Sequence, residues 1–171
     1  MVIQQDTREQ AGKKEHILSY FAANNIKVVR SKLYVGDWTR LDNQTVCIDT
    51  KKDLQEVYGN LVQQHGRFRA ECIRAAEAGI KLVVLVEQAN IKDISDVANW
   101  KNPRIHTWEY YHNAHEHGKL LEHKISPKPP ISSERLSLMM AAMERNYGIE
   151  WQFCDKSETG RRIVEILGGD T

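Results

Sequence analysis

The sequence predicts a single α/β domain in which helices cover both faces of a mixed central sheet. Strand-like and helix-like segments alternate along most of its 171 residues, which is typical of this class. Residues 82–86 form a continuous apolar run, as expected of a central strand buried on both faces. A chain of this length can bury one full hydrophobic core, so we expect one domain spanning residues 1–171.

The first half of the chain supplies most of the expected elements. Apolar side chains recur at helical spacing in three segments, and Gly79 follows the last of them as a C-terminal stop. The segments between them have the apolar character of strands. We therefore expect strands near 2–5, 26–30, 33–35, 45–51 and 81–86, and helices near 13–24, 54–61 and 67–78.

Residues 99–131 interrupt this alternation. They are rich in His, Asn, Lys and Pro, with a proline-rich run at 127–130. We expect a long surface excursion inserted into the domain, with one short helix near 110–121. Loops of this length are often functional. The core of the domain then comprises residues 1–98 and 132–168.

The alternating pattern resumes after the excursion. Methionines and other apolar side chains between Leu136 and Tyr147 share one helical stripe, which we assign to the core rather than to a partner surface. Gly148 ends this helix, and a strand is expected at 149–154. Ser157 is a suitable N-cap for a last helix.

Composition narrows the class of protein. No apolar run approaches the roughly 20 residues that span a bilayer, and the first residues lack the regions of a secretory signal. We therefore expect a cytoplasmic protein without a membrane partner. The three cysteines are far apart and odd in number, which indicates free thiols.

The net charge of +1 argues against a protein that coats DNA by electrostatic attraction alone. It is compatible with a nuclease, whose metal-binding carboxylates cancel part of its basic charge.

Asp49, Thr50 and Lys51 end one of the expected strands. Side chains two residues apart project from the same face of a strand. Asp49 and Lys51 therefore point together, while Thr50 faces the other way. Such a pair taken alone is an ordinary surface ion pair, so its meaning depends on what else reaches this strand end.

A second carboxylate is expected beside this pair. Gly36 and Asp37 follow a short strand about a dozen residues upstream, and pairing of the two strands would bring Asp37 and Asp49 onto one divalent cation. Hard cations such as Mg²⁺ take oxygen ligands, commonly one or two carboxylates with water and substrate phosphate. The backbone carbonyl of Thr50 is a further candidate ligand. Lys51 would then orient or deprotonate the attacking water, or neutralise the phosphorane.

Two more acids follow the first strand. Asp6 and Glu9 flank Arg8, and both carboxylates are candidates to support the metal shell. Their ordinary interpretation is that of acids at the start of a helix. Arg8 is expected at the same strand end, where its guanidinium could bind a phosphate.

Basic residues elsewhere in the chain are candidate DNA contacts. Residues 65–69 open a helix that carries Arg67 and Arg69, and helix N-termini and arginines both favour phosphate. Solvated ion pairs would explain each arginine singly. With Arg8 and Lys52 they form the set of residues that we expect to bind DNA.

These segments in this order resemble the nuclease domain of the XPF/MUS-type (ERCC-type) structure-specific endonucleases of the PD-(D/E)xK superfamily. That family carries Asp-x-Arg-Glu, then Gly-Asp, then Glu-Arg-Lys with a following Asp-Leu, then Gly-Arg and an apolar strand. The corresponding segments here are 6–9, 36–37, 49–51 with 53–54, 66–69 and 82–87. The resemblance covers residues 2–88 closely and 149–167 more loosely.

The resemblance implies a restriction-endonuclease-like fold and Mg²⁺- or Mn²⁺-dependent hydrolysis of DNA at branches, flaps or junctions, in repair or recombination. It also implies dimerisation through the nuclease domain, with a like or unlike partner. A stand-alone domain of this kind resembles phage or mobile-element proteins, which would act in the host-cell cytoplasm. Three features depart from the family pattern: Asp49 replaces its Glu, Thr50 replaces its Arg, and Asp53 follows Lys51 more closely than usual.

Two other functions remain open. The changed Glu-Arg-Lys box is compatible with a catalytically silent DNA-binding or dimerisation module, although such a module has no chemical need for Asp37, Asp49 and Lys51 together. The second open function is that of a recombination or restriction nuclease without selectivity for branched DNA. Convergence of the three side chains on one point would favour catalysis, whereas a salt bridge that blocks the pocket would favour the silent module.

The histidines of the excursion invite a zinc interpretation. His112, His115 and His117 are close in sequence, but zinc sites usually combine such pairs with further ligands. A polar loop that touches DNA or a partner is the preferred interpretation. The neighbouring aromatic residues, Trp108, Tyr110 and Tyr111, would stack on exposed bases or anchor the loop to the core.

Overall fold

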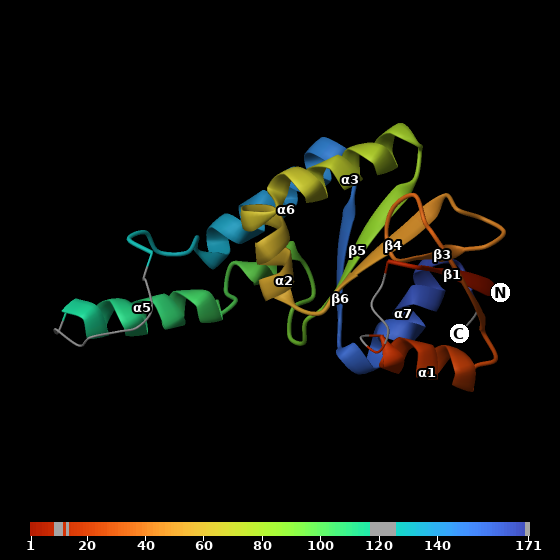
Figure 1. The fold of residues 1–171 in the computed structure, drawn as a ribbon, viewed down its shortest axis with the longest axis horizontal. Coiled ribbons are helices and arrows are strands. Elements are labelled where there is room, and N and C mark those ends of the chain that lie inside the picture. The colour runs from red at the N-terminus through yellow and green to blue at the C-terminus, as the bar shows by residue number, and fades with distance from the viewer. Residues whose placement is uncertain (9–11, 13, 117–125, 170–171) are drawn as a thin grey trace.

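A computed structural model describes residues 1–8, 12, 14–116 and 126–169. Its centre is a six-stranded mixed sheet in the order β2-β1-β3-β4-β5-β6 (Figure 1). Strand β3 runs antiparallel to both of its neighbours, and the other neighbouring strands pair in parallel. The strands are β1 (Val2–Asp6), β2 (Lys27–Ser31), β3 (Trp38–Arg40), β4 (Val46–Lys51), β5 (Lys81–Glu87) and β6 (Glu150–Cys154).

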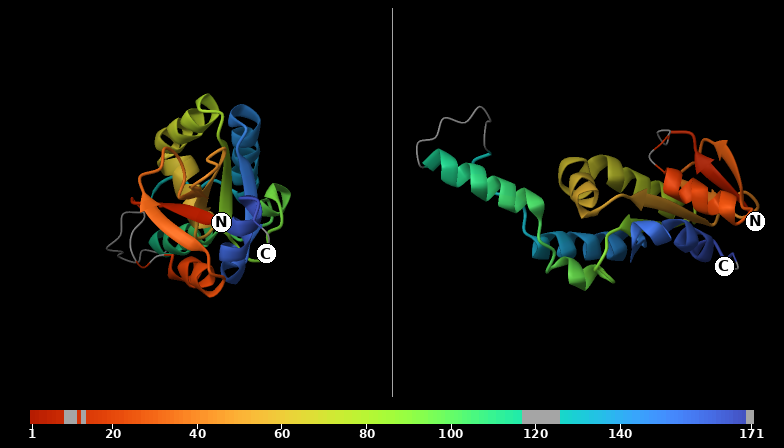
Figure 2. Two further views of the ribbon diagram at one scale, coloured as in Figure 1. Left: turned by 90° about the vertical axis from the view of Figure 1, so that its right-hand side faces the viewer. Right: turned by 90° about the horizontal axis from the view of Figure 1, so that it is seen from below.

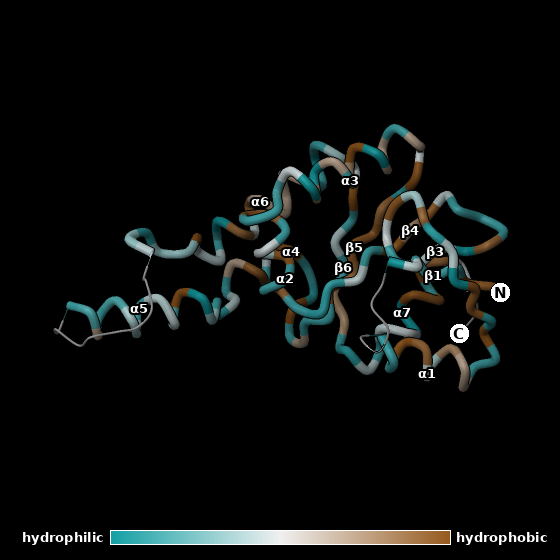
Figure 3. Tube along the Cα trace, viewed as in Figure 1, coloured by the Kyte–Doolittle hydropathy of each residue, from teal (hydrophilic) through white to brown (hydrophobic). Residues whose placement is uncertain are grey.

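Helices cover both faces of the sheet, as the sequence predicts. One face packs against α1 (Glu15–Ala23) and α7 (Thr159–Ile166), and the other against α2 (Leu54–Tyr58), α3 (His65–Glu77) and α6 (Ser133–Tyr147). Successive residues of β5 alternate between the two cores, and all from Leu82 to Val86 are buried. Figure 3 shows these hydrophobic residues concentrated along the central strands. The fold is restriction-endonuclease-like.

The length of β3 determines where the sheet opens. Only two residues of β4 pair with β3, namely Ile48 with Trp38 and Cys47 with Thr39. Strand β4 continues along β5 as far as Lys51, which pairs with Val86. The last residues of β4 therefore have a strand on one side only, and other groups must satisfy the backbone on the open side.

Several expected boundaries were wrong. The strand expected at 33–35 is absent, and β3 begins after Asp37 rather than ending before it. The helix expected over 54–61 ends at Tyr58 and gives way to a π-helical turn at Gly59–Gln63, closed by the Gln64 N–H on the Gly59 carbonyl at 2.9 Å. Ser157 does not cap α7, because it lies inside a 3₁₀ turn at Lys156–Glu158.

The excursion carries one long helix, α5 (Pro103–Glu116), which projects from the body of the molecule (Figure 2). It begins well before the expected position of 110. Asn102 Oδ1 accepts the Arg104 N–H at 3.0 Å, and Pro103 tolerates the first helical position because its missing N–H would have no partner there. A short helix, α4 (Ile94–Val97), precedes it. The predicted end of the helix, at 121, lies outside the described residues.

Four smaller expectations can be compared with the structure. The cysteines are free and buried. The methionine stripe contributes Met140 and Met143 to the core. In the described part of the chain, no helix is both long and apolar enough to cross a membrane, and no three metal-binding side chains cluster. His112 instead stacks on Trp108 with ring centroids 4.4 Å apart, and His117 lies outside the described residues.

Candidate active site

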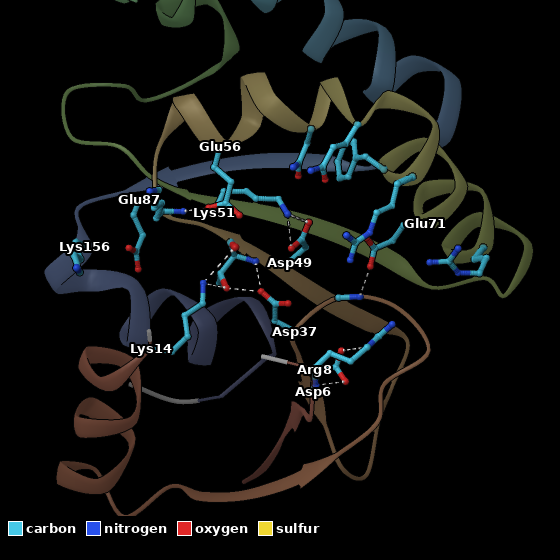
Figure 4. Close-up of a pocket in the computed structure, with 18 residues that line it drawn as sticks. Asp6, Arg8, Lys14, Asp37, Asp49, Lys51, Glu56, Glu71, Glu87 and Lys156 are labelled. Atoms are coloured by element: carbon cyan, nitrogen blue, oxygen red, sulfur yellow. Dashed lines mark hydrogen bonds and ion pairs between the residues drawn. The ribbon is translucent and has the colours of Figure 1, made fainter. Parts of the chain in front are cut away.

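The open end of β4 borders a cavity of about 650 Å³ (Figure 4). Its walls come from the ends of β1, β4 and β5, from the turn before β3, from α3 and from the residue before α1. Charged side chains of both signs dominate the lining. The cationic ones are Arg8, Lys14, Lys51, Lys52, Arg67, Arg74 and Lys156, and the acidic ones are Asp6, Asp37, Asp49, Glu56, Glu71 and Glu87.

Asp49 and Lys51 project from the face of β4 that packs against α3. The Lys51 ammonium donates to Asp49 Oδ1 at 2.9 Å and lies 5.7 Å from the centre of the Phe68 ring. The two side chains are only 6% and 10% exposed. Burial by itself lowers the pKa of Lys51, but the charges of Asp49 and Asp37 outweigh it and raise that pKa above its ordinary value. Lys51 is therefore a cation held beside a carboxylate.

Both Asp49 oxygens face the Lys51 ammonium. The Lys51 Nζ lies 2.9 Å from Oδ1 and 2.7 Å from Oδ2, and Oδ2 is buried with no other described partner. A carboxylate oxygen can accept more than one bond. An oxygen held by one ammonium beside a polar cavity is suited to a cation that binds oxygen.

Gly36 fixes the position of Asp37. Its φ of +70° is in the left-handed region, and a Cβ at this position would lie 2.9 Å from the Ile48 carbonyl oxygen. Only glycine therefore lets the turn approach β4 this closely. The Asp37 N–H then donates to the Ile48 carbonyl at 2.7 Å, and the Asp37 carbonyl accepts the Asp6 N–H at 2.8 Å. The turn is tied to both β4 and β1.

Thr50 links Asp37 to the open edge of β4. Asp37 Oδ2 accepts the Thr50 N–H at 2.9 Å and the Thr50 hydroxyl at 2.6 Å. The ammonium of Lys14 donates to the Thr50 carbonyl at 3.3 Å and to its hydroxyl at 2.8 Å. A carboxylate and an ammonium thus satisfy the backbone groups that a longer β3 would have paired.

The donors available to a metal are few and are all oxygens. No three His, Cys, Asp or Glu side chains gather at one point within the described ranges, so the side-chain set is Asp37 and Asp49. A carbonyl oxygen has two lone pairs, so the bond from Lys14 leaves Thr50 able to bind a second group. Two carboxylates completed by a carbonyl, water and phosphate are a set that Mg²⁺ accepts. These residues fit a hard divalent cation.

The ERCC4 domain profile matches residues 5–166. The chain belongs to the ERCC4 domain family. Two solved structures of XPF from Aeropyrum pernix are similar to it. The first has a TM-score of 0.59 and 17% sequence identity, and the match covers 98% of this chain and 63% of the XPF chain. The second is a complex with DNA and has a TM-score of 0.58 and 17% sequence identity. That match covers 97% of this chain and 62% of the XPF chain. No curated protein matches.

This ERCC4 domain therefore shares its fold with those XPF structures but spans less than two thirds of their length. The expected family and the expected fold are both confirmed. A sequence identity of 17% is evidence for a shared fold alone. The role of each residue must therefore be inferred from the geometry of this chain.

Asp6 and Arg8 form a pair at the rim of the cavity. Arg8 Nε lies 2.5 Å from Asp6 Oδ2, and Arg8 Nη2 donates to the Leu33 carbonyl at 3.0 Å. Asp6 Oδ1 accepts the Leu33 N–H at 3.3 Å. Asp6 Oδ1 therefore holds the segment that leads to the Asp37 turn directly, and Oδ2 holds it through Arg8. The support of a metal by Asp6 stays a prediction. Glu9 lies outside the described residues.

The predicted DNA contacts divide into two groups. Arg67, Lys52 and Arg8 line the cavity of the ERCC4 domain. Arg69 does not, because its guanidinium donates to the Tyr147 hydroxyl at 2.6 Å on the side toward α6. Asp53, whose spacing departs from the family pattern, accepts the Glu56 N–H at 2.8 Å and is the N-cap of α2.

Sequence reasoning missed several polar residues of the cavity, among them Glu71, Glu87 and Lys14. Glu71 Oε1 accepts the Gly36 N–H at 3.0 Å, and Glu87 Oε1 accepts the Thr159 hydroxyl at 2.8 Å and meets His16 Nε2 at 2.5 Å. Glu87 ends a parallel strand, and the rule that sites lie at the carboxyl ends of such strands would have singled it out. Lys14 and Glu71 carry no local signal.

Proposed function

We propose that this domain is a metal-dependent endonuclease that hydrolyses phosphodiester bonds in DNA at branches, flaps or junctions. The observation that carries the proposal is that Asp37, Asp49 and Lys51 line one cavity, in which the Lys51 ammonium is the only described partner of the buried Asp49 Oδ2. Membership of the ERCC4 family supports it. The similar XPF from Aeropyrum pernix has been solved as a complex with DNA, which supports DNA as the substrate.

Each residue has a role in this proposal. Asp37, Asp49 and the Thr50 carbonyl would hold Mg²⁺ or Mn²⁺. When bound, that cation would polarise the phosphodiester and lower the pKa of the attacking water. The Lys51 ammonium would orient that water and offset negative charge on the phosphate. Hydrolysis adds the elements of water across one P–O bond, with the hydroxyl going to phosphorus and the proton to the leaving oxygen.

The rim of the cavity would hold the DNA strand. Arg67 lies in the first turn of α3 and Lys52 directly follows β4, and both are exposed and line the cavity. Arginine and lysine at such positions bind phosphates. Dimerisation through the nuclease domain, expected from the family resemblance, belongs to the same proposal and would present a second binding surface to branched DNA.

A catalytically silent module is the second candidate, and one observation favours it. Lys51 pairs with Asp49 inside the cavity, and a salt bridge at this position opposes metal binding by that carboxylate. Against it stands the remaining capacity of the same oxygen, because Lys51 is the only described partner of Asp49 Oδ2 and a carboxylate oxygen can accept a second bond. The two candidates differ in whether the protein cuts DNA.

The test compares the wild type with Lys51→Ala on labelled flap, fork, Holliday-junction and linear DNA, in Mg²⁺, Mn²⁺ or EDTA. We expect metal-dependent cutting by the wild type and a loss of about 10²–10⁴ in rate for Lys51→Ala, as for loss of a group that assists proton transfer. Lys27→Ala is the matched control, because Lys27 is exposed at the far end of β2.

Each outcome decides between the candidates. Cutting of branched DNA in preference to linear DNA would support the proposed substrate, and equal cutting would favour a nuclease without branch selectivity. Binding without cutting in either metal would establish the silent module. Equal cutting by the wild type and Lys51→Ala would contradict the assignment of Lys51.

A further inference from the structure

Lys14 reaches the proposed active site from a distant part of the chain. It immediately precedes α1 and is half-buried, yet its ammonium bonds Thr50, 36 residues away in sequence. Figure 4 shows the side chain rising from the start of α1 toward the end of β4, next to Asp37. Its position is therefore fixed by the tertiary structure at the edge of the cavity.

The partners of Lys14 leave its charge available. Both bonds go to neutral atoms, the carbonyl and the hydroxyl of Thr50, and Lys14 forms no ion pair with a described carboxylate. Lys51 and Arg8, by contrast, are each paired with an aspartate. An ammonium has three N–H donors, and no described residue accepts the third. Lys14 thus presents both charge and a donor to the cavity.

Thr50 connects this charge to the proposed metal ligands. Its hydroxyl accepts from Lys14 and donates to Asp37 Oδ2 at 2.6 Å. Thr50 also stands where the family pattern carries an arginine. The chain therefore lacks a cation at the middle position of the motif but brings one to that point from the segment before α1.

We propose that Lys14 is a further catalytic residue, whose ammonium contacts a non-bridging oxygen of the scissile phosphate. The inference rests on the proposed nuclease function and names one more residue of that site. Lys14 transfers no proton. It stabilises negative charge on the phosphoryl oxygens while the water oxygen bonds phosphorus and the bond to the leaving oxygen breaks. A positioned cation of this kind acts where charge develops in the transition state.

The experiment uses Lys14→Met, which keeps the length of the side chain without its charge, and Lys14→Arg, which keeps the charge. Lys27→Met is the control. Single-turnover cleavage with Mg²⁺ or Mn²⁺ gives the rate, and DNA binding in Ca²⁺ at several salt concentrations gives the number of phosphate contacts. We expect Lys14→Met to cut about 10²-fold more slowly and to lower the slope of log affinity against log salt by about 1. Lys14→Arg should retain most of the rate and the full slope.

The competing explanation is that Lys14 only satisfies the Thr50 carbonyl. Lys14→Met would then lower the melting temperature, leave the salt slope unchanged and cut as Lys14→Arg does, which would overturn the proposal. Failure of the nuclease function is distinguishable. A wild type that never cuts, together with a lowered slope in Lys14→Met, would place the error in the nuclease proposal and not in the phosphate contact.

Discussion

The cavity at the end of β4 and the projecting helix α5 are both rich in polar side chains, but they are built differently. In the cavity, Asp37, Thr50 and Lys14 come from three distant segments and hold one another by hydrogen bonds. No residue of α5 is buried. Arg104, at the start of α5, lies 4.9 Å from the centre of the Tyr58 ring of α2. Farther along, Trp108 Nε1 donates to the Ser126 carbonyl within the excursion at 2.8 Å.

This difference separates a site from a polar surface. A side chain fixed by partners from several elements has lost its conformational freedom before any ligand arrives, so binding costs less ordering. Asp49 adds a second mark, a buried carboxylate that is paired with a buried ammonium. On α5, the described ion pair between His112 and Glu116 is exposed. Arg104, whose Nε is buried without a described hydrogen-bond partner, lies over the Tyr58 ring of α2. The predictions below test whether the contrast holds.

The largest effect is expected at the buried ion pair. Lys51→Met leaves the Asp49 carboxylate buried without its cation, and removal of one partner of a buried pair typically costs about 3–5 kcal/mol. Chemical denaturation of the metal-free protein would measure the free energy of unfolding. The double variant Asp49→Asn/Lys51→Met should recover most of the loss, because no charge then stays buried. Equal losses in the single and double variants would show that packing, not charge, sets the stability here.

A smaller loss of stability is expected at Gly36. Alanine there would be strained by the positive φ and would meet the Ile48 carbonyl, at a cost of about 1–3 kcal/mol for the backbone conformation. Displacement of Asp37 should slow cleavage on the order of 10²-fold.

Gly79→Ala is the matched control, since its φ of +66° is similar but nothing lies within 4 Å of the added Cβ. It should lose comparable stability and no activity. If the two variants cut DNA equally well, the Gly36 turn does not position a catalytic group.

Glu71 should have a positioning role of intermediate size. Glu71→Ala removes the acceptor of the Gly36 N–H, which typically costs about 1 kcal/mol, and loosens the turn that carries Asp37. Glu71→Gln keeps an oxygen acceptor and should restore most of the effect. Titration of Mn²⁺ by calorimetry would report the change, with weaker binding in Glu71→Ala than in Glu71→Gln. Identical titrations would remove Glu71 from the positioning of the site.

Parts of this architecture follow from local sequence and parts do not. The two-residue period of a strand placed Asp49 and Lys51 on one face, and their ion pair confirms it. Asn102 and Pro103 carry a helix-start signal that the expected helix near 110 overlooked. Lys14 and Glu71 could not be found in this way, because their partners lie 36 and 35 residues away and are chosen by the packing of α1 and α3.

The smallest effect on stability is expected on α5. Tyr110 is 65% exposed, and a surface substitution away from buried features usually changes stability by about 0.5 kcal/mol or less. Tyr110→Ala should therefore leave the unfolding curve and Mn²⁺ binding unchanged. If α5 stacks on bases of a branched DNA, the same variant should weaken binding to DNA with exposed single strands by about 1–3 kcal/mol and leave binding to linear duplex unchanged. Equal affinity of the variant and the wild type for both DNAs would mean that this aromatic face does not contact the substrate, and the contrast with the cavity would be complete.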